Sequence, residues 1–72
     1  MSQQILSELV ANVAAVHVTI GQQVGAGTEV ALLESMKMEI PVLAEAPGTV
    51  EAVHIAPGDL VQEGDSLIVL SD

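Results

Sequence analysis

The residue with the clearest capacity for chemistry is Lys37, the only lysine in a chain of 72 residues that has no arginine. Its amine can be acylated once it loses a proton, but a lysine in water is almost entirely protonated near pH 7. The ionisable neighbours in its segment are Glu34 and Glu39, and carboxylates favour the charged form of an amine. We therefore expect that the chain cannot acylate this lysine efficiently by itself.

Two methionines, Met36 and Met38, flank this lysine. Methionine side chains at an exposed turn leave apolar surface in water, and such surface often marks a recognition site. A simpler interpretation makes Lys37 an ordinary solvated turn residue. The uniqueness of the lysine and its methionine neighbours favour a lysine that is presented to a partner.

The other residues with chemical potential are His17 and His54, together with the regularly spaced glycines. Both histidines are flanked by apolar residues, mostly valines, that should point inward, so we expect the histidines to face solvent. No cysteine or carboxylate stands at ligand spacing beside either of them, so we expect no metal site. The glycine spacing matches neither nucleotide-binding fingerprint, which favours turns over a phosphate loop. Without a nucleophile–base pair, the chain is not expected to be an enzyme.

Composition excludes further classes of partner. Ten acidic residues give a formal charge of −9, and aromatic residues are absent. Such a chain repels nucleic acids and anionic membranes and has no platform for base stacking. No apolar run approaches the roughly 20 residues of a membrane span, and the N-terminus lacks the features of a signal peptide. We expect a cytoplasmic, monomeric protein that attracts basic protein partners.

An internal repeat predicts which strands and turns flank the lysine. Residues 13–35 align without a gap on residues 50–72, and the alignment pairs the two histidines and two sets of glycines. Each half has a valine-rich strand, then a segment with the pattern Gly-x-x-Val-x-x-Gly, then a second strand. The glycines suit turns with positive φ, and the intervening Val24 and Val61 can fill the core.

The apolar pattern predicts one all-β domain over residues 1–72, folded as a sandwich or flattened barrel. If a pseudo-two-fold axis relates the halves, Lys37 lies at the apex of the hairpin 34–39, at the opposite end from the C-terminus. Pro41 is compatible with an edge strand. The expected strands cover residues 5–10, 13–18, 30–36, 38–43, 50–55 and 67–70.

The segment Glu34-Ser35-Met36-Lys37-Met38-Glu39 closely resembles the biotin-acceptor motif of the biotinyl/lipoyl attachment family, typically Glu-Ala-Met-Lys-Met. The likeness covers nearly the whole chain and is greatest for small biotin/lipoyl attachment proteins and the biotinyl domain of biotin carboxyl carrier proteins. It implies a barrel-sandwich hybrid, a flattened barrel of two four-stranded antiparallel sheets with the lysine on an exposed hairpin. Lipoyl domains usually have an acidic residue before the lysine and alanine after it, so Met36 and Met38 favour biotin.

The resemblance also implies a function. Lys37 would carry covalent biotin, attached by a biotin protein ligase that recognises the surrounding Glu34, Ser35, Met36, Met38 and Glu39. The loaded domain would carry a carboxyl group from a biotin carboxylase to a carboxyltransferase. A lipoyl carrier, or a carrier of both groups, is the alternative, and an unmodified interaction module on the same scaffold is the third.

The sequence departs from the family pattern at two places. Ser35 replaces the usual alanine, a change between small residues that a ligase is expected to tolerate. The segment Val10-Ala11-Asn12 stands where the family generally has a Pro/Met/Gly-type segment, which the second half retains as Pro47-Gly48-Thr49. Docking to carboxylase partners is therefore expected to be atypical. No insertion corresponds to the protruding thumb of some bacterial carrier proteins.

Overall fold

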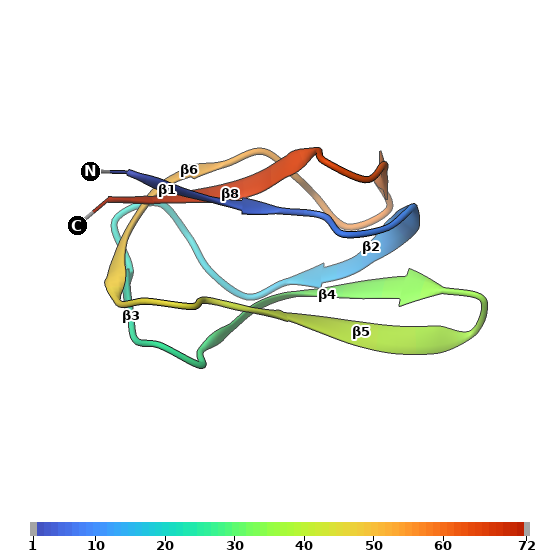
Figure 1. The fold of residues 1–72 in the computed structure, drawn as a ribbon, viewed down its shortest axis with the longest axis horizontal. Helices are drawn as coiled ribbons and strands as arrows, with labels where there is room; N and C mark the ends of the chain where they lie inside the picture. The colour runs from blue at the N-terminus through green and yellow to red at the C-terminus, as the bar shows by residue number, and fades with distance from the viewer. Residues whose placement is uncertain (1, 72) are drawn as a thin grey trace.

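A computed structural model describes residues 2–71, which form strands and turns without any helix. Valine, leucine, isoleucine and alanine make up much of these strands, which is typical of strands that pack against a hydrophobic core. The molecule is elongated, with extents of 33 × 18 × 17 Å (Figure 1). The strands are β1 (Gln3–Leu6), β2 (Ala11–Val16), β3 (Gln23–Val24), β4 (Glu29–Ser35), β5 (Met38–Leu43), β6 (Gly48–Val53), β7 (Leu60–Val61) and β8 (Ser66–Ser71).

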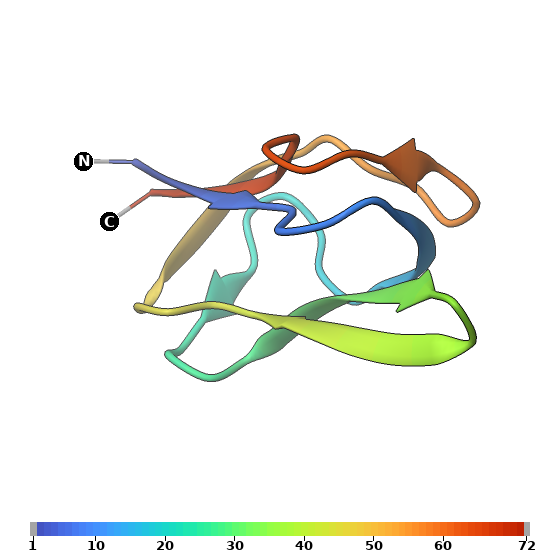
Figure 2. The same cartoon turned by 45° about the vertical axis from the view of Figure 1, so that its right-hand side comes forward.

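The strands form two four-stranded sheets, with the orders β1-β8-β6-β3 and β5-β4-β2-β7. Every pair of neighbouring strands is antiparallel. The two layers enclose a single core. In both ribbon views, β1, β6 and β8 lie on one side of the molecule and β4 and β5 lie on the other (Figure 1 and Figure 2). The expected all-β sandwich of two four-stranded antiparallel sheets is confirmed. Its largest fully buried side chains are Leu33, Leu67, Ile68, Leu70, Val30 and Val50.

The internal repeat is also visible in the structure. A shift of 37 residues carries β2 onto β6, β3 onto β7 and β4 onto β8, and carries β1 into β5. The same shift converts one sheet order into the other. Backbone hydrogen bonds that involve the loops are related by the same shift of 37 residues. The amide of Gly21 donates to the carbonyl of Val50 at 2.8 Å, and the amide of Gly58 donates to the carbonyl of Val13 at 2.8 Å.

The repeated glycines occupy turns that need a left-handed backbone. Gly21, Gly27, Gly58 and Gly64 have φ values between 87° and 95°, and the space beside each of them is open. Backbone conformation, rather than crowding, therefore requires glycine at these positions. Val24 and Val61, which lie between the glycines, are buried as predicted.

Several expected strand boundaries were wrong. The first strand was expected over residues 5–10, but β1 covers Gln3–Leu6, because a bulge follows Ile5 and the chain bends at Glu8 and Leu9. The buried hydroxyl of Ser7 donates to the carbonyl of Leu9 at 2.6 Å and so holds this bend. The two-residue strands β3 and β7 were missed, because their residues lie inside the glycine-punctuated segments.

The turn that carries Lys37 and the two ends of the chain lie at opposite ends of the molecule. The turn between β4 and β5 lies at one end of the long axis, while the start of β1 and the end of β8 lie at the other (Figure 1). This arrangement agrees with the position that the repeat predicted for the lysine hairpin. Pro41 lies in β5, an edge strand, as expected for a residue without an amide hydrogen.

Candidate functional site

Lys37 lies in a two-residue turn that joins β4 to β5. Ser35 and Met38 form the last strand pair, and Met36 and Lys37 between them have φ values of 52° and 66°. Positive φ at both central residues is the signature of a type I′ turn, whose twist matches that of the flanking strands. Such turns usually contain Asn-Gly, because residues with a longer side chain lose energy in the left-handed region. Met36 and Lys37 are therefore both unfavourable residues for this turn, and strained backbone positions of this kind cluster at functional sites.

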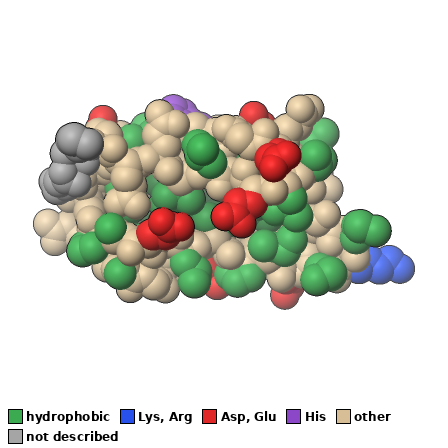
Figure 3. Space-filling view, in the orientation of Figure 1, with side chains coloured by type: hydrophobic (Ala, Val, Ile, Leu, Met, Phe, Trp, Pro, Cys, Tyr) green, Lys and Arg blue, Asp and Glu red, His purple; other side chains and the backbone are tan. Residues whose placement is uncertain are grey.

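The side chains of the turn project into solvent. Met36 is 92% exposed, Met38 is 64% exposed and Lys37 is exposed. Within residues 2–71, no hydrogen bond or ion pair involves the ammonium group of Lys37. The only blue side chain in Figure 3, which colours lysine and arginine, protrudes beyond the end of the body. The amine is therefore accessible to an enzyme, and no polar partner among the described residues holds it.

The hairpin is anchored just behind this exposed tip. Leu33 and Ile40 are directly opposite each other in β4 and β5; Leu33 is 1% exposed, and Ile40 packs against the core. Between this buried pair and the turn, Glu34 faces Glu39 across the strands, and both are exposed. Like charges directly opposite each other are destabilising. The structure thus combines a rigid base with an acidic, unfavourable pair beside the lysine.

All six residues that the sequence assigned to the acceptor segment lie together in this hairpin, from Glu34 to Glu39. The atypical segment Val10-Ala11-Asn12 lies beside it, because Asn12 pairs with Glu34 and Ala11 is buried. Pro47-Gly48-Thr49, which matches the family pattern, lies at the opposite end, where Thr49 pairs with Ser71 in β8.

The two histidines lie outside this site. Both are exposed, as expected, but His17 has a partner that the sequence did not predict: its Nε2 lies 2.7 Å from Oε2 of Glu29. The two residues are far apart in sequence, and the antiparallel pairing of β2 with β4 brings them together. No group of three or more potential metal ligands occurs within residues 2–71.

One sequence signal at the hairpin end was missed. Leu60, in β7, is 63% exposed and lies directly opposite Asn12, in the same row of the sheet as Glu34. The signal that could have revealed it is the repeat itself. The equivalent position in the first half is Gln23, so an exposed leucine is not needed to build this strand.

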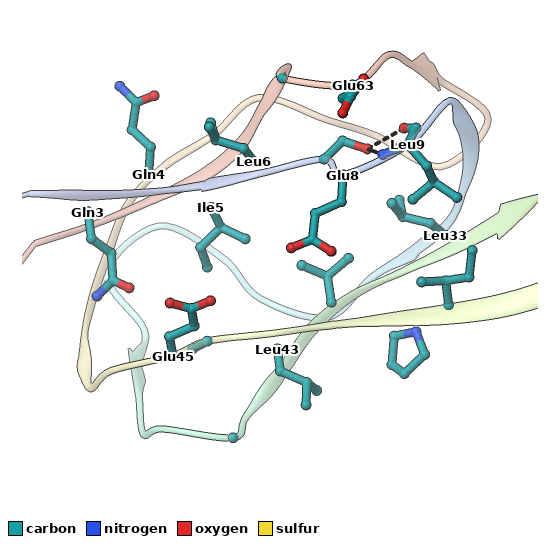
Figure 4. A pocket seen from close by; sticks show the side chains of 17 residues that line it. Gln3, Gln4, Ile5, Leu6, Glu8, Leu9, Leu33, Leu43, Glu45 and Glu63 are labelled. Atoms are coloured by element: carbon teal, nitrogen blue, oxygen red, sulfur yellow. Dashed lines mark hydrogen bonds between the residues drawn. The ribbon is translucent and has the colours of Figure 1, made fainter.

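A groove of about 990 Å³ lies along one side of the molecule, between the edge strands β1 and β5. Ile5, Leu33 and Val42 are among the apolar side chains that line it, and Glu8 and Glu45 point into it from opposite sides (Figure 4). Lys37 is not part of its lining. The lysine is thus presented on a projection rather than within a pocket.

Within residues 2–71, no helix is long and apolar enough to cross a membrane.

Comparison with known proteins identifies relatives along the whole chain. The biotin/lipoyl family model, described as "Biotin-requiring enzyme", matches residues 4–70. The chain is 48% identical over 71 residues to the "Biotinylated protein TB7.3 homolog" of Mycobacterium leprae (strain TN), covering 99% of this chain and 100% of that protein. It is 49% identical over 65 residues to the "Biotin/lipoyl attachment protein" of Bacillus subtilis (strain 168), covering 90% and 89% of the two chains.

Solved structures give the same result. A segment of the urea carboxylase of Kluyveromyces lactis matches with a TM-score of 0.91 and 30% identity over 99% of this chain, which corresponds to 6% of that much longer chain. The lipoyl domain of the 2-oxoglutarate dehydrogenase complex from Azotobacter vinelandii matches with a TM-score of 0.76 and 30% identity, over 88% of this chain and 80% of that domain. The protruding lysine hairpin, the repeated fold and these relatives lead to one conclusion: the chain belongs to the biotin/lipoyl attachment domain family, which also includes domains of biotin carboxyl carrier proteins and carboxylases.

Proposed function

We propose that the chain is a biotin carboxyl carrier, acylated with biotin on Lys37 by a biotin protein ligase. The observation that carries the proposal is an exposed lysine on a type I′ turn, flanked by two exposed methionines and without a polar partner among residues 2–71. The name of the Mycobacterium leprae relative, a biotinylated protein, supports biotin as the attached group. The lipoyl domain shares the fold, so the choice of biotin rests on Met36 and Met38 rather than on the scaffold.

Acylation requires an activated biotinyl group from outside. The neutral Nζ of Lys37 attacks the acyl carbon of biotinyl-adenylate, the new N–C bond forms, and the bond between the acyl carbon and the phosphate oxygen breaks. Adenylate leaves with the electron pair of that bond, and the amine nitrogen releases a proton to solvent. The product amide has no charge, so the chain loses its only lysine charge and becomes one unit more negative than −9.

Once loaded, the domain carries a group and does not catalyse its transfer. Biotin supplies the chemistry of carboxyl transfer, and the protein supplies position and mobility. The turn presents the arm beyond the body, so the same arm can enter a biotin carboxylase and then a carboxyltransferase. Tethering keeps the group at an effective concentration on the order of millimolar at each partner. The net negative charge of the body favours partners with basic entrance surfaces.

The test is the intact mass of the purified chain after incubation with biotin, ATP and a biotin protein ligase, with Lys37→Arg as the matched control. We expect one biotinyl group on the wild type and none on the variant, because arginine keeps the charge but lacks the acylatable amine. An equally loaded Arg variant would refute the site.

A parallel reaction with lipoate and a lipoate ligase tests the second candidate, a lipoyl or dual carrier, which the name of the Bacillus subtilis relative favours. Lipoylation without biotinylation would replace the proposal with that candidate. No modification by either ligase would favour an unmodified interaction module.

A further inference from the structure

Exposed apolar side chains gather at the end of the molecule that carries Lys37. Met36 and Met38 belong to the hairpin itself, while Val10 and Leu60 come from two other parts of the chain. Val10 is 58% exposed and precedes β2 directly; Leu60 begins β7 and is 63% exposed. Exposed apolar clusters of this kind in a small domain mark interaction surfaces more often than isolated apolar residues do.

Strand register places Leu60 on the same surface as the acidic residues of the hairpin. In the sheet β5-β4-β2-β7, Glu39 is opposite Glu34, Glu34 is opposite Asn12, and Asn12 is opposite Leu60. Residues directly opposite each other project from the same face of a sheet. Ala11 and Val13, on either side of Asn12, are buried, so the row lies on the outer face. At about 4.8 Å per strand, the row is roughly 14 Å wide.

The repeat provides an internal control for what the scaffold requires. Position 60 corresponds to Gln23, which pairs with Thr49 just as Leu60 pairs with Asn12. Position 10 corresponds to Pro47, and position 34 corresponds to Ser71. The same backbone is therefore built at the opposite end with polar or small residues in place of Leu60 and Glu34. The composition of the row at the hairpin end is not dictated by the fold.

An enzyme that acylates Lys37 must contact more than the turn. A specific protein interface covers about 800 Å² of each partner, far more than a two-residue turn can supply. The nearest rigid surface continuous with the hairpin is the outer face of its own sheet. We propose that Val10, Leu60, Glu34 and Glu39 form the docking face for the enzyme that acylates Lys37. This inference rests on the proposed function.

The face also defines the chemistry of the enzyme surface that it fits. Leu60 and Val10 require an apolar contact, and the carboxylates of Glu34 and Glu39 require basic groups beside it. Charge pairs of this kind mainly increase the rate of association and weaken with salt. The apolar contact supplies affinity that salt does not screen.

The test measures kcat/KM for biotinylation by a biotin protein ligase, followed by intact mass, for Leu60→Gln. Glutamine is the residue that the repeat itself uses at this position, so the melting temperature should stay close to that of the wild type. Losing the burial of a leucine side chain should lower kcat/KM by about five- to thirtyfold. Leu60→Met keeps an apolar contact and should restore most of the rate. Ile20→Gln is the matched control, because Ile20 is 70% exposed in the loop after β2, at the far end of that strand.

The outcomes separate the two proposals. A wild-type chain that accepts no biotin refutes the proposed function and this docking face with it. A biotinylated wild type with an unchanged rate for Leu60→Gln refutes the docking face alone. Equal slowing by Leu60→Gln and Ile20→Gln also refutes it, since the effect would then be independent of position. Slowing that is confined to Leu60→Gln and reversed in Leu60→Met supports it.

Discussion

Replacing Met36 with asparagine should make the protein more stable and a poorer substrate. Met36 has a φ of 52° and is 92% exposed, so its side chain contributes almost no burial to the fold. A left-handed conformation costs a residue such as methionine about 1–2 kcal/mol, and asparagine is one of the few side chains that tolerate it. We expect Met36→Asn to recover part of that cost, roughly 0.5–1 kcal/mol, because asparagine is a preferred residue in type I′ turns.

The measurement is thermal unfolding followed by circular dichroism. For a domain of this size, the gain corresponds to a rise of about 2–8 °C in the melting temperature. The control is Met38→Asn, the same substitution two residues further along the chain. Met38 lies in β5, where the backbone is extended and asparagine is disfavoured. The two variants should therefore shift the melting temperature in opposite directions.

The same preparation of Met36→Asn is then tested for biotinylation, and its rate should fall because a ligase contact is lost. A lower melting temperature for Met36→Asn would mean that the turn or the packing of Met36 has been misunderstood. A higher melting temperature together with an unchanged rate of biotinylation would mean that the ligase does not read Met36. Only a higher melting temperature together with slower biotinylation fits a turn in which Met36 contributes to ligase recognition and lowers the stability of the fold.

Two further substitutions test the surroundings of the site and the opposite end of the molecule. Glu39→Gln removes the charge repulsion with Glu34, so urea unfolding at low salt should show a fold more stable by about 0.3 kcal/mol. In 1 M salt this gain in stability should disappear, because salt screens the repulsion. Gly48→Ala should lower the free energy of unfolding by roughly 1–3 kcal/mol, because the new Cβ would lie 2.5 Å from the carbonyl oxygen of Ser71. An unchanged midpoint of urea unfolding would show instead that β8 can shift to make room.

The repeat made most of the architecture predictable from the sequence. Matching histidines and glycines align the halves, and this alignment alone predicts Lys37 at the end opposite the C-terminus. Strand ends were less predictable, because local side-chain contacts decide them. The first strand ends early, at a bend in which the hydroxyl of Ser7 donates to the carbonyl of Leu9. Backbone pairing continues as β3 and β7 through segments that glycine punctuation marked only as turns.

The acceptor segment was predictable because its residues are consecutive. The row that includes Asn12, Glu34 and Leu60 was not, because these residues come from three strands that are distant in sequence. Only strand register brings them together, and a bulge near Val13 changes that register in a way that apolar periodicity does not reveal. The contact between His17 and Glu29 escaped prediction for the same reason.

The way in which the two halves share the sheets has a consequence for how the fold could have arisen. Only two of the strand pairings, β2 with β4 and β6 with β8, lie within one half; β1 with β8, β3 with β6, β4 with β5 and β2 with β7 join one half to the other. A half-length chain alone would leave most of its strand edges unpaired, and it could not bury its apolar face. Two identical copies, however, could satisfy every pairing by two-fold symmetry. Such an ancestor would fold only as it dimerised, with a stability that depends on concentration. Joining the two copies covalently at one end would create the hairpin that now carries Lys37. The stability of the joined chain would then no longer depend on protein concentration.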